Sequence, residues 1–180
     1  MGHNGPAKAN RTGKATANDS VQTPDALARQ IVAAFPIAGR TLEPCSGEAA
    51  FLRALPAGTE WCEIKEGRDF FDYTGKADWI VTNPPYSIYD AFLAKCFEVA
   101  DNVVLLVPLS KTLKSIRIER MVDAYGGLKE IRILGGGGVA GFPFGFLTGV
   151  VHYQRGYKGP IQRSWGLEPV GIEEVARAQE

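Results

Sequence analysis

The sequence predicts an α/β domain with a doubly wound, mostly parallel sheet and an antiparallel hairpin at its C-terminal end. Short apolar strands alternate with amphipathic helical segments between residues 21 and 134, which is the pattern of βαβ units. Residues 103–107 are apolar throughout, as expected for a strand that is covered on both faces. A chain of 180 residues with 45% apolar residues is long enough for one domain with a substantial core.

The first helix is expected to begin near Thr23, which can cap it, with Pro24 and Asp25 in its first turn. The other helices are expected at residues 48–55, 89–99 and 111–124. The strands are expected at residues 40–42, 61–64, 77–81, 103–107, 129–134 and 150–153, with a flexible glycine-rich loop over residues 135–146. The last strand belongs to the antiparallel hairpin, which we expect at the edge of the sheet.

The chain divides into three parts. Residues 1–20 have almost no large apolar side chain and are expected to form a disordered arm. Residues 21–157 form the single domain. Residues 158–180 are expected to be a weakly structured tail with a short helix near residues 172–178.

Composition disfavours several functional classes. Two histidines and three cysteines without the spacing of metal ligands make a metal site improbable. No apolar stretch approaches the roughly 20 residues of a membrane span, and the N-terminus lacks the apolar core of a signal peptide, so we expect a cytoplasmic protein. The formal net charge is zero, so a nucleic-acid partner has to be argued from a local basic patch.

The tetrapeptide Asn83-Pro84-Pro85-Tyr86 follows an apolar run and so ends a predicted strand, where ligands bind in open α/β sheets. Two prolines stiffen the loop and remove two donors. The Asn83 side chain and the Pro84 carbonyl are acceptors for the two N–H groups of a planar amine, and Tyr86 offers a flat ring. The tetrapeptide therefore predicts a site that positions an exocyclic amine for attack on an electrophile. An ordinary strand-to-turn junction is the alternative.

A predicted strand, an acid, a glycine turn and a helix follow one another earlier in the chain, as in nucleotide-binding crossovers. Glu43 in this loop would repel a pyrophosphate but attract an ammonium group, and Gly47 permits close backbone approach. Glu63 ends the next strand, where an acid can accept both hydroxyls of a ribose. Asp69 and Phe70 could hold an adenine by its amine and its face. A ligand with these groups and no phosphate is S-adenosylmethionine, although each residue alone also fits a strand end or the core.

With these residues the chain resembles class I S-adenosylmethionine-dependent methyltransferases, which have a Rossmann-like fold. It is most similar to the amino-methyltransferases that modify adenine N6 in DNA, including compact versions from phage genomes. The family's loop pattern acid-Pro-x-x-Gly-x-Gly-x-Phe matches residues 43–51 except at Ala49, which replaces the second glycine. The resemblance implies catalysis by Asn83, Pro84, Pro85 and Tyr86, with the tyrosine ring stacked on the target base. It implies cofactor binding by Thr23, Glu43, Pro44, Cys45, Gly47, Glu63, Asp69, Phe70 and Asn83.

The resemblance covers residues 21–157, with two departures besides Ala49. Only five residues separate Glu63 from Asp69, so a helix of the family is missing or reduced there, and we expect a truncated sheet edge beyond the second strand. The chain also has no room for a separate target-recognition domain, so a partner or a homodimer is a candidate for that role.

Cations recur every three residues on the helix predicted at residues 111–124, namely Lys111, Lys114, Arg117 and Arg120. They are candidates for contacts with DNA phosphates, and a solvated basic face is the alternative. The phenylalanines of residues 135–146 could wedge into DNA or pack under the hairpin. The leading hypothesis is methylation of a flipped-out adenine in DNA. A base amine in RNA or a protein glutamine would suit the same loop, and a non-catalytic nucleic-acid-binding subunit is the alternative of another class.

Overall fold

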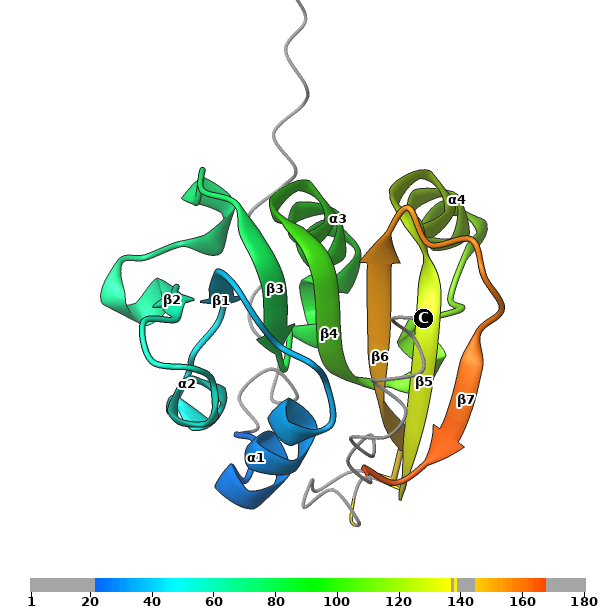
Figure 1. Ribbon diagram of the computed structural model, residues 1–180, viewed down its shortest axis with the longest axis horizontal. Helices are drawn as coiled ribbons and strands as arrows, with labels where there is room; N and C mark the ends of the chain where they lie inside the picture. Colours follow the sequence, from blue (N-terminus) through cyan, green and yellow to red (C-terminus); the bar gives the residue numbers. More distant parts are fainter. Residues whose placement is uncertain (1–21, 137, 139–144, 168–180) are drawn as a thin grey trace, which may run out of the picture.

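A computed structural model describes residues 22–136, 138 and 145–167. One sheet of seven strands lies between two helical layers (Figure 1). The strand order is β2-β1-β3-β4-β6-β5-β7. β6 is antiparallel to both of its neighbours, and all other pairs are parallel. The strands are β1 (Thr41–Glu43), β2 (Glu60–Trp61), β3 (Ala77–Thr82), β4 (Ala100–Pro108), β5 (Gly126–Gly136), β6 (Leu147–Arg155) and β7 (Gln162–Trp165).

The helices divide between the two faces of the sheet. Those on one face are α1 (Asp25–Ala33) and α2 (Ala50–Ala54), and those on the other are α3 (Tyr89–Val99) and α4 (Ile116–Tyr125) (Figure 1). Strand β4 serves both hydrophobic clusters, because successive side chains of a strand point to opposite faces. Val104 and Leu106 pack with α1 and α2, whereas Val103 and Leu105 pack with α3 and α4. The apolar run of this strand is thereby explained.

The doubly wound sheet and its antiparallel C-terminal part are confirmed, but the expected position of the hairpin is wrong. β6 lies between β4 and β5, in the interior of the sheet. Its residues Val150, Val151 and Tyr153 are fully buried, which a strand at the edge could not achieve. In the described residues the sheet ends at β2, which contains only Glu60–Trp61, in agreement with the expected truncation.

The segment from residue 158 onward was expected to be weakly structured, and the structure corrects this in part. Residues 162–165 form β7, which pairs in parallel with β5. All four residues are exposed, so the strand has no apolar pattern that a sequence could reveal. It is held by main-chain pairing to the long strand β5. The predicted arm over residues 1–20, the helix near residues 172–178 and Phe142 lie outside the described residues.

Two predicted helix starts are also corrected. Pro24, not Thr23, is the N-cap residue of α1, and no side chain caps this helix. Helix α4 begins at Ile116, because the Ser115 hydroxyl accepts a hydrogen bond from the Ile118 N–H and caps it there. A separate 3-10 turn, η5 (Leu109–Lys111), precedes it.

Within the described ranges, no helix is long and apolar enough to cross a membrane. The same residues also contain no group of three or more His, Cys, Asp or Glu side chains that could hold a metal ion.

Candidate active site

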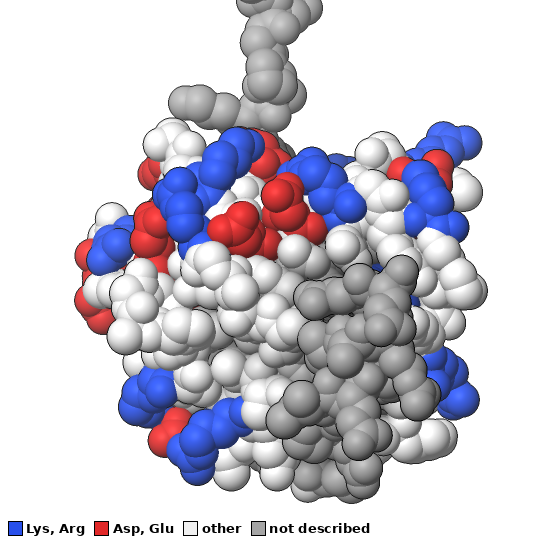
Figure 2. Space-filling view, in the orientation of Figure 1, with Lys and Arg blue, Asp and Glu red and all other residues white. Residues whose placement is uncertain are grey.

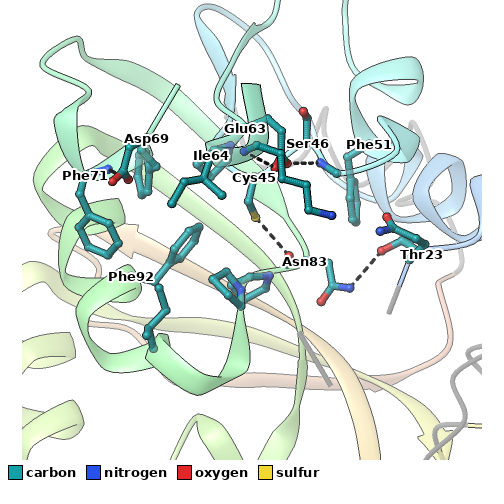
Figure 3. A pocket seen from close by; sticks show the side chains of 18 of the residues that line it. Thr23, Cys45, Ser46, Phe51, Glu63, Ile64, Asp69, Phe71, Asn83 and Phe92 are labelled. Atoms are coloured by element: carbon teal, nitrogen blue, oxygen red, sulfur yellow. Dashed lines mark hydrogen bonds between the residues drawn. The ribbon is translucent and has the colours of Figure 1, made fainter. Parts of the chain in front are cut away.

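The segments that follow β1, β2 and β3 meet around a cavity of about 300 Å³ (Figure 3). They meet because the carboxyl ends of parallel strands lie at one edge of the sheet. The wall of this cavity contains most of the predicted site residues: Thr23, Pro44, Cys45, Gly47, Glu63, Asp69, Phe70, Asn83, Pro84 and Pro85. Glu43 and Tyr86 are absent from the wall.

Glu63 joins the loop after β1 to the turn after β2 on the wall of the cavity. It follows β2 and caps the 3-10 turn η2 (Ile64–Glu66). One carboxylate oxygen accepts the Gly47 N–H at 2.8 Å, and the other accepts the Lys65 N–H at 3.1 Å. Each oxygen keeps a further lone pair. The carboxylate can therefore accept two ligand hydroxyls while it holds the Gly47 loop in place.

The loop between β1 and α2 has an unusual backbone at two positions. Gly47 has a φ of 51° and Ala49 a φ of 65°, both in the left-handed region that glycine adopts without steric cost. Ala49 is the one non-glycine residue with positive φ in the part of the chain that the structure describes. Its N–H donates to the Ser46 carbonyl at 2.7 Å and closes the turn. Ala49, which stands where the loop pattern has its second glycine, therefore adopts a strained backbone conformation.

Glu43 lies beneath the cavity and not in its wall, which corrects the expectation that it meets a ligand ammonium directly. It is 1% exposed, and its Oε1 accepts hydrogen bonds from the Thr82 hydroxyl and the Cys45 N–H. Burial raises the pKa of Glu43 to about 8. Glu43 thus links the floor of the Cys45 loop to the end of β3 as a predominantly neutral acid at pH 7.

Cys45 connects this floor to the loop of Asn83. Its thiol donates to the main-chain carbonyl of Asn83 at 3.2 Å, and its sulfur lies 3.0 Å from the Thr82 hydroxyl. Burial raises the pKa of the Cys45 thiol well above its usual value, so the group stays a neutral hydrogen-bonding residue.

Aromatic side chains form one end of the cavity (Figure 3). Asp69 accepts the Phe71 N–H at 2.9 Å and so caps the 3-10 turn η3 (Phe70–Asp72). The ring of Phe70 is buried and lies 5.0 Å from the ring of Phe92 on α3. Asp69 retains its second oxygen as an acceptor beside these apolar faces, which suits a flat heterocycle with an amine.

Asn83 lies at the other end of the cavity, on the side of Thr23 (Figure 3). Its Nδ2 donates to the Thr23 hydroxyl at 3.2 Å. Its Oδ1 accepts the Tyr86 hydroxyl at 2.8 Å and keeps a second lone pair. Thr23 was predicted to contact the cofactor, and in the structure its hydroxyl holds the Asn83 amide.

Tyr86 does not present its ring to the cavity, contrary to the stacking role that the resemblance implied. It is 7% exposed, and its hydroxyl points inward to Asn83 and to the Leu106 carbonyl at 3.3 Å. The residues after it, Ser87 and Ile88, line the cavity instead. Tyr86 thus braces Asn83 from within the core of the domain.

The four predicted phosphate ligands do not lie on one helix, because α4 begins only at Ile116. The Lys111 ammonium donates to the main-chain carbonyl of Tyr86 at 3.1 Å. Lys114 forms an ion pair with Asp90 at 2.7 Å. Lys111 therefore holds the loop that contains Tyr86, and Lys114 holds the start of α3. Arg117 and Arg120 are exposed on α4.

Several wall residues escaped sequence reasoning. Phe92 belongs to the apolar face of α3, and an apolar helix face indicates only that the face is buried. Phe92 lies both in the core and in the cavity wall. Ile64 and Lys65 directly follow Glu63, so their position beside the predicted ribose acid was the one available signal.

The chain was compared with known proteins. No family model matches it, and no curated protein matches it in sequence. Solved structures do match. The type IIG restriction endonuclease BpuSI has a TM-score of 0.59 at 14% identity, over 88% of this chain and 28% of its own. The M protein of the type I restriction enzyme EcoKI has a TM-score of 0.57 at 15% identity, over 74% of this chain and 44% of its own.

A protein from Listeria monocytogenes, whose name assigns it to the class I S-adenosylmethionine-dependent methyltransferases, has a TM-score of 0.53. It is 8% identical, over 86% of this chain and 66% of its own. The fold is therefore that of class I S-adenosylmethionine-dependent methyltransferases. Identities of 8–15% establish likeness of fold alone. The chain spans less than half the length of the two restriction enzymes.

Proposed function

We propose that this chain transfers a methyl group from S-adenosylmethionine to the exocyclic N6 amine of a flipped-out adenine in DNA. The observation that carries the proposal is the shared cavity. Its wall contains both the amine-binding loop, with Asn83 and Pro84, and the acids suited to an adenosine, Glu63 and Asp69. The cofactor, the catalytic loop and the DNA substrate are all part of this proposal.

The cofactor half fits the proposed ligand by its donors and acceptors. Glu63 has one remaining lone pair on each oxygen for the two ribose hydroxyls, because Gly47 and Lys65 occupy only one each. Asp69 and Phe70 provide an acceptor and an apolar face for the adenine. Glu43 is neutral and buried, so Gln22 and Thr23 in the wall are the candidates for the polar methionine end.

When bound, the cofactor would supply a methyl group on a sulfonium; the carbon–sulfur bond would break as the amine nitrogen bonds to the methyl carbon, the thioether would leave, and the methylated nitrogen would release its extra proton to water. Asn83 Oδ1 and the Pro84 carbonyl accept one N–H each, which aims the nitrogen lone pair at the methyl group. Tyr86 and Thr23 hold the Asn83 amide in place before the substrate arrives, and Lys111 holds the main-chain carbonyl of Tyr86 in the same loop. Preorganised acceptors of this kind stabilise the positive charge that develops on the nitrogen.

The test is transfer of tritium from labelled S-adenosylmethionine to unmethylated DNA, total RNA and a protein extract in parallel. We expect label in DNA, recovered as N6-methyladenine after digestion, and none with Asn83→Ala. Label in RNA or protein alone would refute the DNA substrate and keep the amine-binding loop. No label in any substrate, also after addition of a host-cell extract that could supply a recognition partner, would refute the enzyme activity itself.

A further inference from the structure

Strand β7 was not expected from the sequence, and its edge of the sheet carries an exposed pair of side chains. Trp165 is 66% exposed. The Arg163 guanidinium lies 5.5 Å from the centre of its indole ring. Both belong to the same face of β7, because alternate residues of a strand share a face. Arg163 forms no ion pair with any acidic residue in the described ranges.

The sheet register relates this pair to the catalytic loop. Thr82, which precedes Asn83, pairs with Leu105, and Leu105 pairs with Val151. Val151 pairs with Ile131, which in turn pairs with Arg163. Arg163 therefore lies in the same row of the sheet as Thr82, four strands away. At about 4.8 Å between neighbouring strands, the separation is about 19 Å.

Trp165 is two residues beyond Arg163 in the direction of the carboxyl ends, the edge where Asn83 lies. A polynucleotide that places one nucleotide at Asn83 and crosses this edge would reach Trp165 within about six nucleotides, at about 3.4 Å per step along a helical strand. An arginine stacked on an exposed indole is the combination that binds unpaired bases and their phosphates.

We infer that Arg163 and Trp165 form a second nucleic-acid contact, on which a base that flanks the target stacks. The inference rests on the proposed function and adds to it the place where the polynucleotide leaves the active site. It assigns part of target binding to the catalytic domain itself. Arg117, exposed in the first turn of α4, is a candidate phosphate contact along the way, because α4 packs against β5 and β6.

A nucleic acid is a better occupant of this edge than a protein strand. β7 offers four residues, three of which are polar: Gln162, Arg163 and Ser164. So short an edge cannot supply the roughly 1,000 Å² that a stable protein interface needs. The other end of the strands, where the parallel strands begin, has a different charge distribution, with cations and anions intermixed (Figure 2). There Arg40 pairs with Glu60 and Arg155 pairs with Asp101, so these two arginines are already neutralised.

The experiment compares two oligonucleotides in the methylation assay with the full chain. A 20-mer with a central adenine can reach β7, whereas a 5-mer with two nucleotides on each side reaches only about 7 Å at helical spacing. Trp165→Ala and Arg163→Ala should raise KM for the 20-mer about 5- to 150-fold, the range of one base stack. KM for the 5-mer and kcat should stay unchanged, and Trp165→Phe should retain most of the affinity.

Lys76→Ala, at the other end of the strands beside the start of β3, is the matched control and should behave as the unmodified chain. If the 5-mer is too poor a substrate, fluorescence anisotropy with a labelled 20-mer gives the same comparison as a change in Kd. Unchanged KM and Kd for the 20-mer in both variants would overturn the inference while leaving the proposed function standing. Dimerisation that Trp165→Ala abolishes, with unchanged DNA affinity, would overturn it in favour of a protein interface. Absence of methylation by the unmodified chain would instead count against the proposed function.

Discussion

Replacement of Ala49 by glycine should stabilise this protein, although glycine usually destabilises. Ala49 has a φ of 65° and a ψ of 26°, at the N-cap of α2. An L-residue with a Cβ atom loses about 1–2 kcal/mol in this left-handed region, and glycine does not. Glycine in turn costs about 0.4–1 kcal/mol, because it enlarges the conformational freedom of the unfolded chain. The net expectation is a gain of about 1 kcal/mol in the free energy of unfolding.

A gain of that size corresponds to a rise of about 2–4 °C in Tm for a chain of this length. Chemical denaturation monitored by circular dichroism gives the free energy directly. The matched control is Ala94→Gly, since Ala94 is exposed in the middle of α3, and there glycine should cost about 1 kcal/mol. The same substitution, alanine to glycine, should thus raise the free energy of unfolding at position 49 and lower it at position 94. If Ala49→Gly destabilises as much as Ala94→Gly, the backbone argument is wrong.

Three further predictions concern the supports of the site. Burial raises the pKa of Glu43 to about 8, so the folded chain keeps a proton that the unfolded chain releases above about pH 4.3. The stability that this bound proton contributes is fully present below that pH and is lost toward pH 8, by up to about 1.4 kcal/mol per pH unit. Denaturation experiments from pH 5 to 8 should show that Glu43→Gln removes this decrease in the free energy of unfolding. Lys111→Met should lower kcat several-fold and leave the salt dependence of DNA binding unchanged, whereas Lys114→Met should leave kcat intact. If each variant instead reduces the slope of log K against log salt concentration by about one, both lysines contact phosphates. Asn83→Ala should lower kcat about 100-fold or more, whereas calorimetry should show a far smaller change in the Kd for the cofactor. Tyr86→Phe should lower kcat because its hydrogen bond to Asn83 is lost; full activity of Tyr86→Phe would favour ring stacking alone.

The sequence predicted the sheet and the cavity wall well, because both depend on local patterns. An apolar run that ends in Asn83-Pro84 is a strand followed by a loop wherever it occurs, and parallel strands bring such loops to one edge. Glu63 and Asp69 followed from the same reasoning and line the cavity with Asn83. Strand β7 gave no signal, because all four of its residues are exposed and it depends on pairing with β5.

The roles of individual side chains were harder to predict than their location. Lys111 and Lys114 belong to a basic repeat that favours phosphate binding, yet one holds the Tyr86 carbonyl and the other Asp90. These partners lie 25 and 24 residues away along the chain, so no local pattern contains them. Glu43 and Tyr86 show the same limit, since each was assigned to the ligand and each points into the protein.

These corrections have a common physical meaning for the proposed mechanism. A loop that must hold a weakly nucleophilic amine gains from acceptors whose positions are fixed before binding. Glu43, through Thr82 and Cys45, and Tyr86 and Lys111 all hold the Asn83 loop from the protein side. In this chain the Asn83 loop is thus supported by Glu43 and Tyr86, which the resemblance assigned to the cofactor and to the target base, and by Lys111, which the basic repeat assigned to DNA phosphates. Neither Tyr86 nor Lys111 lines the cavity. Tyr86→Phe and Lys111→Met are nevertheless expected to lower turnover, because each removes a hydrogen bond that holds the Asn83 loop.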